Sequence, residues 1–255
     1  MKKEIKNILI TGASSGIGEA LALYYSANGA NSLFLCGRNK DRLQQVADNC
    51  RRFGCQVYTK TIDVTNREKM SEWILHCNKK APLNLVFANA GVSTGTEICE
   101  NVYKTFSTNI FGVLNTIMPI IDVYKKRKNN SERKIIAITS SIAGYHGLPA
   151  CPSYSATKAC IKAYGEALRG SLRGDGIEVN IICPGFVKSR ITDKNTCPMP
   201  FFMPAEKAAK IIANQIDKNI GLIAFPWPMR LATWGLSILP NRLSDFIYRL
   251  LPHKV

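Results

Sequence analysis

The sequence predicts an α/β fold, with one domain built on a doubly wound parallel sheet. Short runs rich in β-branched residues and leucine alternate with longer amphipathic stretches over the first two-thirds of the chain. Among its 255 residues, 46% are hydrophobic and 20% are charged, which is typical of a packed globular domain. No repeat or low-complexity linker divides the chain. Because parallel strands need crossover connections, helices should cover both faces of the sheet.

Seven strands are expected, and each is a short apolar run bounded by turn residues. The helix after the first strand has apolar residues at i, i+3, i+4 and i+7, and Gly29 can end it. These helix residues are Ile17, Ala20, Leu21 and Tyr24. The expected strands are Asn7–Ile10, Ser32–Cys36, Gln56–Ile62, Leu83–Ala88, Lys134–Thr139, Glu178–Ile182 and Gly221–Ala224.

The pattern changes after the seventh strand, so residues 1–225 are interpreted as the main domain and 226–255 as an amphipathic extension. An apolar stretch runs to Leu239. From Asn241, an N-cap residue type, a helix of this extension should place its apolar residues opposite its charged ones. This helix can pack on its own domain, on a partner subunit or weakly on a membrane surface. The apolar residues are Leu243, Phe246, Ile247, Leu250 and Leu251, and the charged ones are Arg242, Asp245 and Arg249.

The chain is strongly basic, because 34 Lys and Arg against 18 Asp and Glu give a formal net charge of +16. Such a surface attracts anions such as nucleotides and acidic lipids. The densest basic run, residues 125–128, has no interleaved aromatic residues and fits a helix C-terminus better than a polyanion site, so no specific nucleic-acid partner is expected. Nine cysteines without a C-x-x-C pair indicate reduced thiols in a cytoplasmic protein, with no metal site. The first residues do not resemble a secretory signal.

A glycine-rich turn from Thr11 to Gly18 follows the first strand and opens the first helix. Its glycines permit a tight turn and close approach of a diphosphate, which the free N–H groups of a helix start can bind. The strand–turn–helix context therefore predicts a dinucleotide site. The residues expected to contact the cofactor here are Gly12, Ser14, Ser15, Gly16, Ile17 and Gly18.

The end of the second strand indicates which dinucleotide is bound. A carboxylate for the ribose is expected about 20 residues after the glycines, but this chain has Gly37 and Arg38 there. Arg38 can pair with a 2′-phosphate, so NADP(H) is predicted over NAD(H), unless Arg38 is only an exposed residue at a helix start. Asp63 and Val64, after the third strand, are expected at the adenine, although Asp63 can equally be a helix cap.

Several short motifs follow one another along the chain. They are Thr11-Gly12-x-x-x-Gly16-x-Gly18, Asn89-Ala90-Gly91, Asn109, Ser140-Ser141, Tyr154-x-x-x-Lys158 and Pro184-Gly185-Phe186-Val187. In these motifs and their order the chain resembles the short-chain dehydrogenase/reductase family. The resemblance extends from residue 11 to residue 189 and implies a Rossmann-type seven-stranded sheet and pyridine-nucleotide oxidoreductase chemistry.

Tyr154 and Lys158, four residues apart on a predicted helix, share one face. A phenol with an ordinary pKa of about 10 is a poor acid or base near neutrality. A nearby ammonium should lower that pKa, so that Tyr154 serves as general acid or base. The resemblance implies that Ser141 hydrogen-bonds the same substrate oxygen, that Lys158 also holds the nicotinamide ribose, and that Asn109 holds a water molecule. Each residue alone has an ordinary structural explanation.

The resemblance also implies further cofactor contacts on the nicotinamide side. Ser189 stands where the family usually has a threonine, so a hydroxyl is retained. The complete set adds Asn89, Ala90, Gly91, Tyr154, Lys158, Pro184, Gly185, Val187 and Ser189 to the residues named above.

Substrate contacts are expected from Ala143–Pro152 and from Lys188–Met203. The second segment has an apolar run from Met199 to Met203, which is either a lid over an apolar or amphipathic carbonyl or alcohol, or a segment packed on its neighbours. Relatives are commonly homodimers or homotetramers built on helices around residues 101–127 and 153–173. The alternative function is a catalytically quiet nucleotide-binding sensor or scaffold of the same fold.

Overall fold

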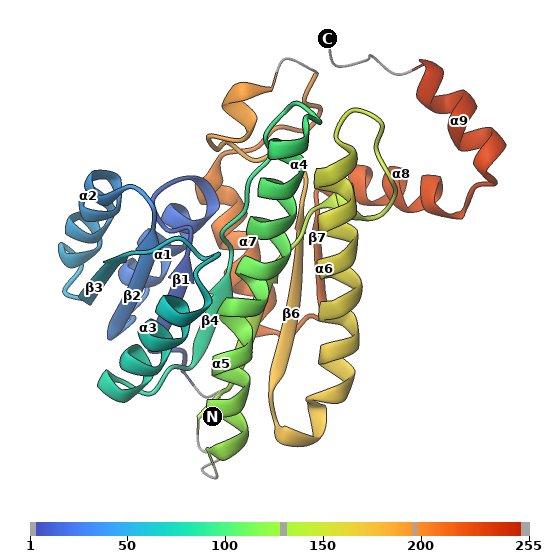
Figure 1. The fold of residues 1–255 in the computed structure, drawn as a ribbon. Coiled ribbons are helices and arrows are strands. Elements are labelled where there is room, and N and C mark those ends of the chain that lie inside the picture. Colours follow the sequence, from blue (N-terminus) through green and yellow to red (C-terminus); the bar gives the residue numbers. More distant parts are fainter. Residues whose placement is uncertain (1–3, 128–131, 196–197, 251–255) are drawn as a thin grey trace.

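The computed structural model describes residues 4–127, 132–195 and 198–250. Its centre is one seven-stranded parallel sheet with the strand order β3-β2-β1-β4-β5-β6-β7 (Figure 1). The predicted α/β class and parallel sheet are therefore confirmed. The strands are β1 (Asn7–Thr11), β2 (Ser32–Gly37), β3 (Gln56–Thr61), β4 (Leu85–Ala88), β5 (Ile135–Thr139), β6 (Glu178–Pro184) and β7 (Leu222–Phe225).

Helices cover both faces of the sheet (Figure 1). One layer contains α1 (Gly16–Ala27), α2 (Lys40–Arg51) and α7 (Ala205–Asp217). The other contains α3 (Arg67–Lys80), α5 (Gly112–Lys126) and α6 (Pro152–Ser171). The helix α4 (Cys99–Phe106) is joined to α5 by a π-helical turn, Ser107–Phe111, and contacts α6.

The continuous apolar runs of the strands follow from burial on both faces. In β1, Ile8 and Ile10 belong to the core under α1, α2 and α7, whereas Leu9 belongs to the opposite core. This is the period of two that a strand imposes. The strand β4 starts at Leu85, two residues later than predicted, and the Asn84 carboxamide oxygen just before it accepts the backbone N–H groups of Lys6 and Asn7.

The strand order places a cleft at one edge of the sheet. The strand β1 lies between β2 and β4. The connection after β1 therefore runs toward the β3 edge of the sheet, and the connection after β4 runs toward the β7 edge. At such a reversal the loops after the strands separate and leave a crevice at the carboxyl ends. The turns after β1, β2, β4 and β5, which carry most of the sequence motifs, all meet there.

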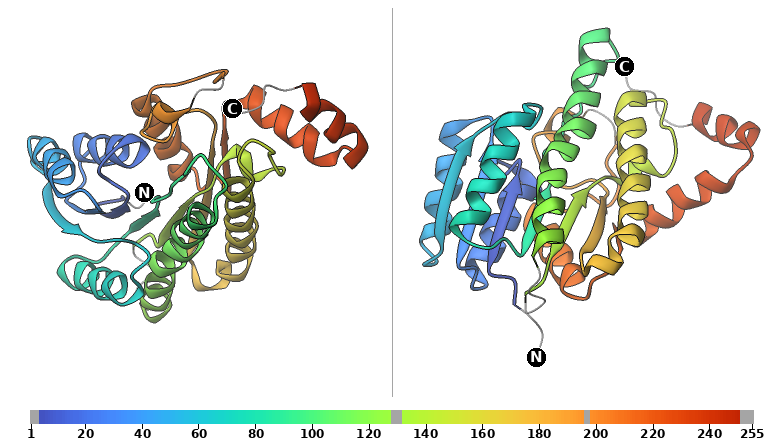
Figure 2. Two further views of the ribbon diagram at one scale, coloured as in Figure 1. Left: turned by 45° about the horizontal axis from the view of Figure 1, so that its top comes forward. Right: turned by 60° about the horizontal axis from the view of Figure 1, so that its bottom comes forward.

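The C-terminal segment forms α8 (Trp227–Ile238) and α9 (Asn241–Leu250), which extend away from the β7 edge of the sheet (Figures 1 and 2). No residue of α8 is buried. The helix predicted from Asn241 is α9, and of its predicted apolar face Leu243 and Phe246 are exposed. Leu251 lies outside the described residues. The boundary at 225/226 stays a prediction.

One continuous helical stretch in the described part of the chain, Cys99–Lys126, is long and apolar enough to cross a membrane, with a mean hydropathy of 1.3. Within its most apolar window, 44% is buried inside the molecule. Since α5 forms part of the hydrophobic core through side chains such as Ile117 and Tyr124, this stretch is interpreted as a core helix.

Candidate active site

A cleft of about 430 Å³ lies at the carboxyl ends of the strands. It joins the glycine-rich turn at one end to the start of α6 at the other. Of the predicted cofactor residues, all but Gly18 line it. These lining residues are Gly12, Ser14, Ser15, Gly16, Ile17, Arg38, Asp63, Val64, Asn89, Ala90, Gly91, Tyr154, Lys158, Pro184, Gly185, Val187 and Ser189.

The glycine-rich turn requires glycine at three positions. Gly12 and Gly16 have φ angles of +67° and +58°, which side chains rarely adopt. A Cβ atom on Gly12 would lie 2.8 Å from the Cα atom of Ala90. A Cβ atom on Gly18 would overlap the Gly12 carbonyl oxygen and lie 2.7 Å from the Asn89 side-chain nitrogen. Gly18 therefore supports the turn from beneath without lining the cleft.

Thr11 connects this turn to the segment that follows β4. Its hydroxyl donates to the Phe87 carbonyl at 3.1 Å and accepts the backbone N–H groups of Asn89 and Ala90 at 3.0 and 3.1 Å. The Asn89 side chain donates to the Thr11 carbonyl at 3.1 Å. Because these groups satisfy one another, the two loops hold a fixed spacing across the cleft.

Arg38 and Asp63 face each other at the end of β2, with Nη1 and Oδ2 3.7 Å apart. Asp63 also accepts the Thr65 backbone N–H at 3.0 Å and hydroxyl at 2.8 Å, so it caps its own turn, as the alternative interpretation of the sequence allows. Both side chains are roughly half exposed, so their ion pair contributes little to stability and leaves Arg38 available.

Arg42 is a second basic residue of this site that the sequence analysis missed. It stands one helical turn after Arg38, lines the cleft, and its Nε atom is buried without a hydrogen-bond partner in the described residues. A buried donor without a partner costs free energy, which an anion in the cleft would recover. The spacing of four residues at a helix start was the available signal.

Ser141, Tyr154 and Lys158 meet at the other end of the cleft. The Lys158 ammonium is buried, donates to the Thr139 carbonyl at 2.9 Å and lies 5.6 Å from the centre of the Tyr154 ring. The Ser141 hydroxyl hydrogen-bonds the Tyr154 phenol and thereby lowers its pKa. Ser140 fixes the helix beneath them by donating to the Lys158 carbonyl at 2.7 Å.

The pKa of Tyr154 departs from the expectation of a more acidic phenol. Burial raises this pKa to about 12, against the smaller lowering by Ser141. Burial also lowers the pKa of the Lys158 ammonium to about 8, because a charged group loses hydration in the protein interior. For Tyr154, desolvation thus outweighs the hydrogen bond with Ser141, and Tyr154 holds its proton at neutral pH.

Asn109 is fully buried in the π-helical turn and does not line the cleft. Its carboxamide accepts the Val92 backbone N–H at 2.8 Å and donates to the Val92 carbonyl and to the Thr157 hydroxyl, both at 3.0 Å. The Thr157 hydroxyl donates in turn to the Tyr154 carbonyl at 2.8 Å. Asn109 thus ties the loop after β4 to the helix turn that carries Tyr154, and its predicted contact with a water molecule stays a prediction.

The loop after β6 closes the nicotinamide end of the predicted site. Ser189 and Thr192 are joined by hydrogen bonds, and the Ser189 backbone N–H donates to the Thr192 hydroxyl at 2.8 Å. Arg190, Ile191 and Thr192 also line the cleft, and all three belong to the segment Lys188–Met203 that was expected to contact substrate. The other lining residues without a predicted contact are Gly37, Asn39, Ile62, Val92, Ser93, Thr108, Thr139 and Ser140.

The apolar run from Met199 to Met203 does not line the cleft. Met203 is buried in the core against α7, whereas Phe201 and Phe202 are exposed. The strand-like pairing of Val187 with Met203 fixes the end of this segment. The structure therefore supports packing for Met203 and leaves the two phenylalanines facing outward.

Comparison with known proteins is consistent with this geometry. A family model described as short chain dehydrogenase matches residues 6–198. An uncharacterized oxidoreductase of Myxococcus xanthus is 36% identical over 251 residues, which cover 96% of this chain and 97% of that protein. The 11-beta-hydroxysteroid dehydrogenase-like 4A protein of Arabidopsis thaliana is 31% identical over 253 residues, covering 93% of this chain and 82% of that protein.

Solved structures share the fold at lower identity. A short chain dehydrogenase/reductase from Burkholderia phymatum in complex with NAD has a TM-score of 0.83 at 22% identity, covering 98% of this chain and 96% of its own. A short-chain dehydrogenase from Sphingobium yanoikuyae in complex with NADPH has a TM-score of 0.79 at 21% identity, covering 92% and 97%. The match of the family model over most of the chain shows that this protein belongs to the short-chain dehydrogenase family of oxidoreductases.

Proposed function

We propose that this chain is an NADP(H)-dependent oxidoreductase that interconverts a carbonyl and an alcohol on an apolar or amphipathic small molecule. The observation that carries the proposal is the meeting of Ser141, Tyr154 and Lys158 at one end of a cleft whose other end is the glycine-rich turn. A proton-transferring group and a turn suited to binding a diphosphate thus line the same cleft.

The cleft fits a nicotinamide dinucleotide. The first turn of α1 begins after Ser15, whose side chain makes no capping hydrogen bond, so backbone N–H groups remain for a diphosphate. Arg38 and Arg42 line the same cleft beside this turn, since Gly37 lies against Ser14, and Arg42 contributes a buried donor without a partner in the described residues. Proteins of this fold have been solved with NADPH, with NAD and with 5-hydroxy-NADP, which supports the cofactor class.

In the proposed reaction the bound nicotinamide supplies the hydride, and the chain handles the proton. Tyr154 donates its phenolic proton to the carbonyl oxygen as the alcohol forms, and Ser141 hydrogen-bonds the same oxygen. The raised pKa of about 12 keeps Tyr154 protonated before reduction. Lys158 holds its ammonium next to the ring, where it stabilises the phenolate left behind.

A Tyr154→Phe variant tests the mechanism, because it removes only the hydroxyl. Turnover of any accepted carbonyl with NADPH should fall by about 10²–10⁴-fold. Tyr164→Phe is the matched control on the same helix, since among the described residues the hydroxyl of Tyr164 hydrogen-bonds only the Met118 sulfur, at 3.8 Å. Near-parental activity of the Tyr154 variant contradicts the proposal. NADPH binding without turnover across a broad carbonyl panel favours the sensor alternative.

The preference for NADP(H) is tested by removing the two arginines. Arg38→Ala and Arg42→Ala should each raise KM for NADPH by about tenfold while leaving KM for NADH nearly unchanged, because a guanidinium paired with a 2′-phosphate has no partner on NADH. Arg51→Ala, at the far end of α2 and paired with Asp48, is the control. A parallel rise in both KM values contradicts recognition of the 2′-phosphate.

An apolar or amphipathic substrate is supported by one comparison: the relative from Arabidopsis thaliana is named as a hydroxysteroid dehydrogenase-like protein. A panel of carbonyls of increasing chain length, run with NADPH and with NADH, measures this: kcat/KM should rise with apolar length, and a preference for short polar carbonyls contradicts it.

We further propose a homodimer or homotetramer that uses α4, α5 and α6. Four large apolar side chains on the α4–α5 surface are exposed, which is unusual for a monomer. They are Tyr103, Phe106, Phe111 and Met118. Light scattering should give a dimer or tetramer mass, and Phe111→Asp should shift it toward the monomer.

Residues 226–255 provide the proposed contact with a membrane surface, within an otherwise cytoplasmic protein. The exposed apolar residues of α8 and α9 support it. Replacing both Trp227 and Trp234 with serine should reduce co-sedimentation with phospholipid vesicles, because tryptophan is favoured at the membrane–water interface. Equal sedimentation of parent and variant contradicts this contact.

A further inference from the structure

Four exposed apolar side chains form one stripe along α8. They stand at offsets of four, seven and eleven residues from the first, so they share a face of the helix. They are Trp227, Leu231, Trp234 and Ile238, and each is at least half exposed. Leu243 and Phe246 of α9 add to the exposed apolar surface. Two of the chain's three tryptophans lie in this stripe, whereas Trp73 is buried.

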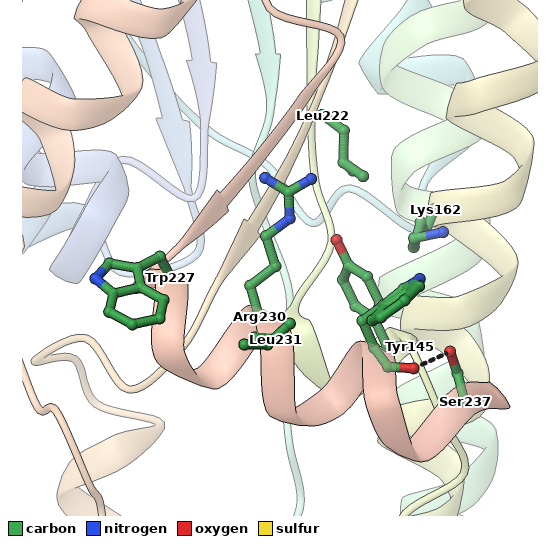
Figure 3. A pocket seen from close by; sticks show the side chains of 8 residues that line it. Tyr145, Lys162, Leu222, Trp227, Arg230, Leu231 and Ser237 are labelled. Carbon is green, nitrogen blue, oxygen red and sulfur yellow. Dashed lines mark hydrogen bonds between the residues drawn. The ribbon is translucent and has the colours of Figure 1, made fainter. Parts of the chain in front are cut away.

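Two pockets adjoin α8, and Arg230 and Trp227 line both of them. The first, of about 580 Å³, is lined by Tyr145, Lys162, Arg230 and Trp234 among others (Figure 3). The second, of about 380 Å³, contains Lys207 together with Arg230. The lining residues of both pockets include three cations and no carboxylate. The other lining residues are mostly apolar, so the two pockets fit a molecule that joins an anionic group to an apolar part.

Arg230 is the cation best placed to take that anion. Lys162 is paired with Glu166 at 2.9 Å, but no carboxylate of the described residues forms an ion pair with Arg230. Figure 3 shows Arg230 rising from α8 between Trp227 and Tyr145. The Tyr145 hydroxyl is buried and has no hydrogen bond of good geometry in the described part of the chain. A guanidinium beside a hydroxyl is a suitable donor pair for a phosphate oxygen.

The charge of the surroundings favours a lipid surface over a second copy of the chain. No Asp or Glu occurs between Asp217 and Asp245, and residues 226–255 hold four basic side chains against one acidic one. A second copy docked through this same segment would bring the same locally basic surface, and the two would repel. The anionic face of a membrane attracts both the charge and the tryptophans.

We propose that α8 and α9 dock on an anionic phospholipid bilayer, with Arg230 holding a lipid phosphate in the pockets that adjoin α8. The inference rests on the proposed membrane contact of residues 226–255 and adds the lipid class and the site. The same helix packs on the active-site end of the molecule, since Gly185 lies against Pro226 and Met229. Docking therefore brings the mouth of the cleft close to apolar molecules dissolved in the bilayer.

The experiment is co-sedimentation of the full chain with vesicles of phosphatidylcholine alone or with added phosphatidylglycerol, at fixed salt. Arg230→Gln should weaken binding to the anionic vesicles by more than tenfold and leave binding to neutral vesicles unchanged. Arg242→Gln is the matched control, because Arg242 is exposed on α9 and carries the same charge. It should lose no more than about fivefold, the contribution of one basic residue near an anionic surface.

Each outcome bears on the inference. If both variants lose the same affinity for anionic vesicles, the attraction is diffuse and the phosphate site at Arg230 is wrong. The proposed membrane contact is then still supported. If the parent fails to bind either vesicle, the membrane contact itself is wrong. A dimer mass that disappears on mutation of Trp234 to serine, without vesicle binding, assigns the surface to a second copy. Circular dichroism verifies folding of the variants, and the parent's tryptophan emission should shift to the blue at lower lipid concentration with anionic vesicles.

Discussion

The cleft at the strand ends and the α8–α9 segment are both rich in apolar and basic residues, yet the fold uses them in opposite ways. In the cleft, the loops after β2, β4 and β5 follow fully buried strands, and polar groups such as those of Thr11 and Asn89 satisfy one another. In α8, no residue is buried and the apolar stripe faces outward. A hydrophobic pattern therefore forms a core only where another layer lies opposite it.

A large effect on cofactor binding is expected from Gly18→Ala. The new Cβ atom would overlap the Gly12 carbonyl and approach the Asn89 side chain, so the turn must open. Affinity for NADPH, measured by fluorescence titration, should fall by about 100-fold, equivalent to about 3 kcal/mol. Gly170→Ala in α6, where nothing lies within 4 Å of the new atom, is the control and should bind normally. Unchanged affinity in the Gly18 variant would show that the glycine-rich turn does not bind the cofactor.

A pair of identical substitutions compares the two regions directly. Leu21 of α1 is fully buried and Leu231 of α8 is 56% exposed. Leu21→Ala should lower the free energy of unfolding by about 2–5 kcal/mol through the cavity it leaves, and Leu231→Ala by less than about 0.5 kcal/mol. Urea unfolding of the cofactor-free chain measures both. Similar losses in the two variants would mean that, in solution, α8 is covered by a surface other than that of its own chain.

Lys158→Met is expected to remove activity and yet stabilise the cofactor-free protein by about 1–2 kcal/mol at pH 7, since burial disfavours the ammonium. The folded pKa of about 8 lies below the ordinary 10.5, so between these values the unfolded state binds more protons. This lysine's contribution to the parent's stability therefore rises with pH across that window, and the variant's advantage should shrink.

Thermal melting at pH 7 and pH 10 checks this, with Lys162→Met as the control, because Lys162 pairs with Glu166 near the surface. An advantage of the Lys158 variant that is equal at both pH values would contradict a buried charge as its cause.

The smallest effect is expected from Glu97→Gln. The Glu97 carboxylate accepts the Ser153 hydroxyl at 2.8 Å and its backbone N–H at 3.2 Å, at the start of the helix that carries Tyr154. Loss of this charge at a helix N-terminus should cost about 1 kcal/mol. Glu72→Gln, exposed on α3, should cost nothing measurable in the same urea titration. If both variants behave alike, the contact does not support α6.

Much of the cleft could be predicted because its residues follow strands directly. A strand's carboxyl end places the next few residues at one edge of the sheet, so the positions of Arg38, Asn89 and Ser141 follow from local pattern alone. Arg42 was missed although it stands one helical turn after Arg38. The acidity of Tyr154 was predicted in the wrong direction, because desolvation depends on burial by segments distant in the sequence.

The sequence by itself determined the α/β class, the strand positions, the glycine-rich turn and the family's motifs, since these depend on neighbours within a few residues along the chain. Only the tertiary structure decided that Asn109 bonds within the protein, that Lys158 is buried, and that the apolar stripe of α8 faces outward above Arg230. Those properties depend on which distant segments pack together, and the free energies of burial and hydrogen bonding are set by that packing.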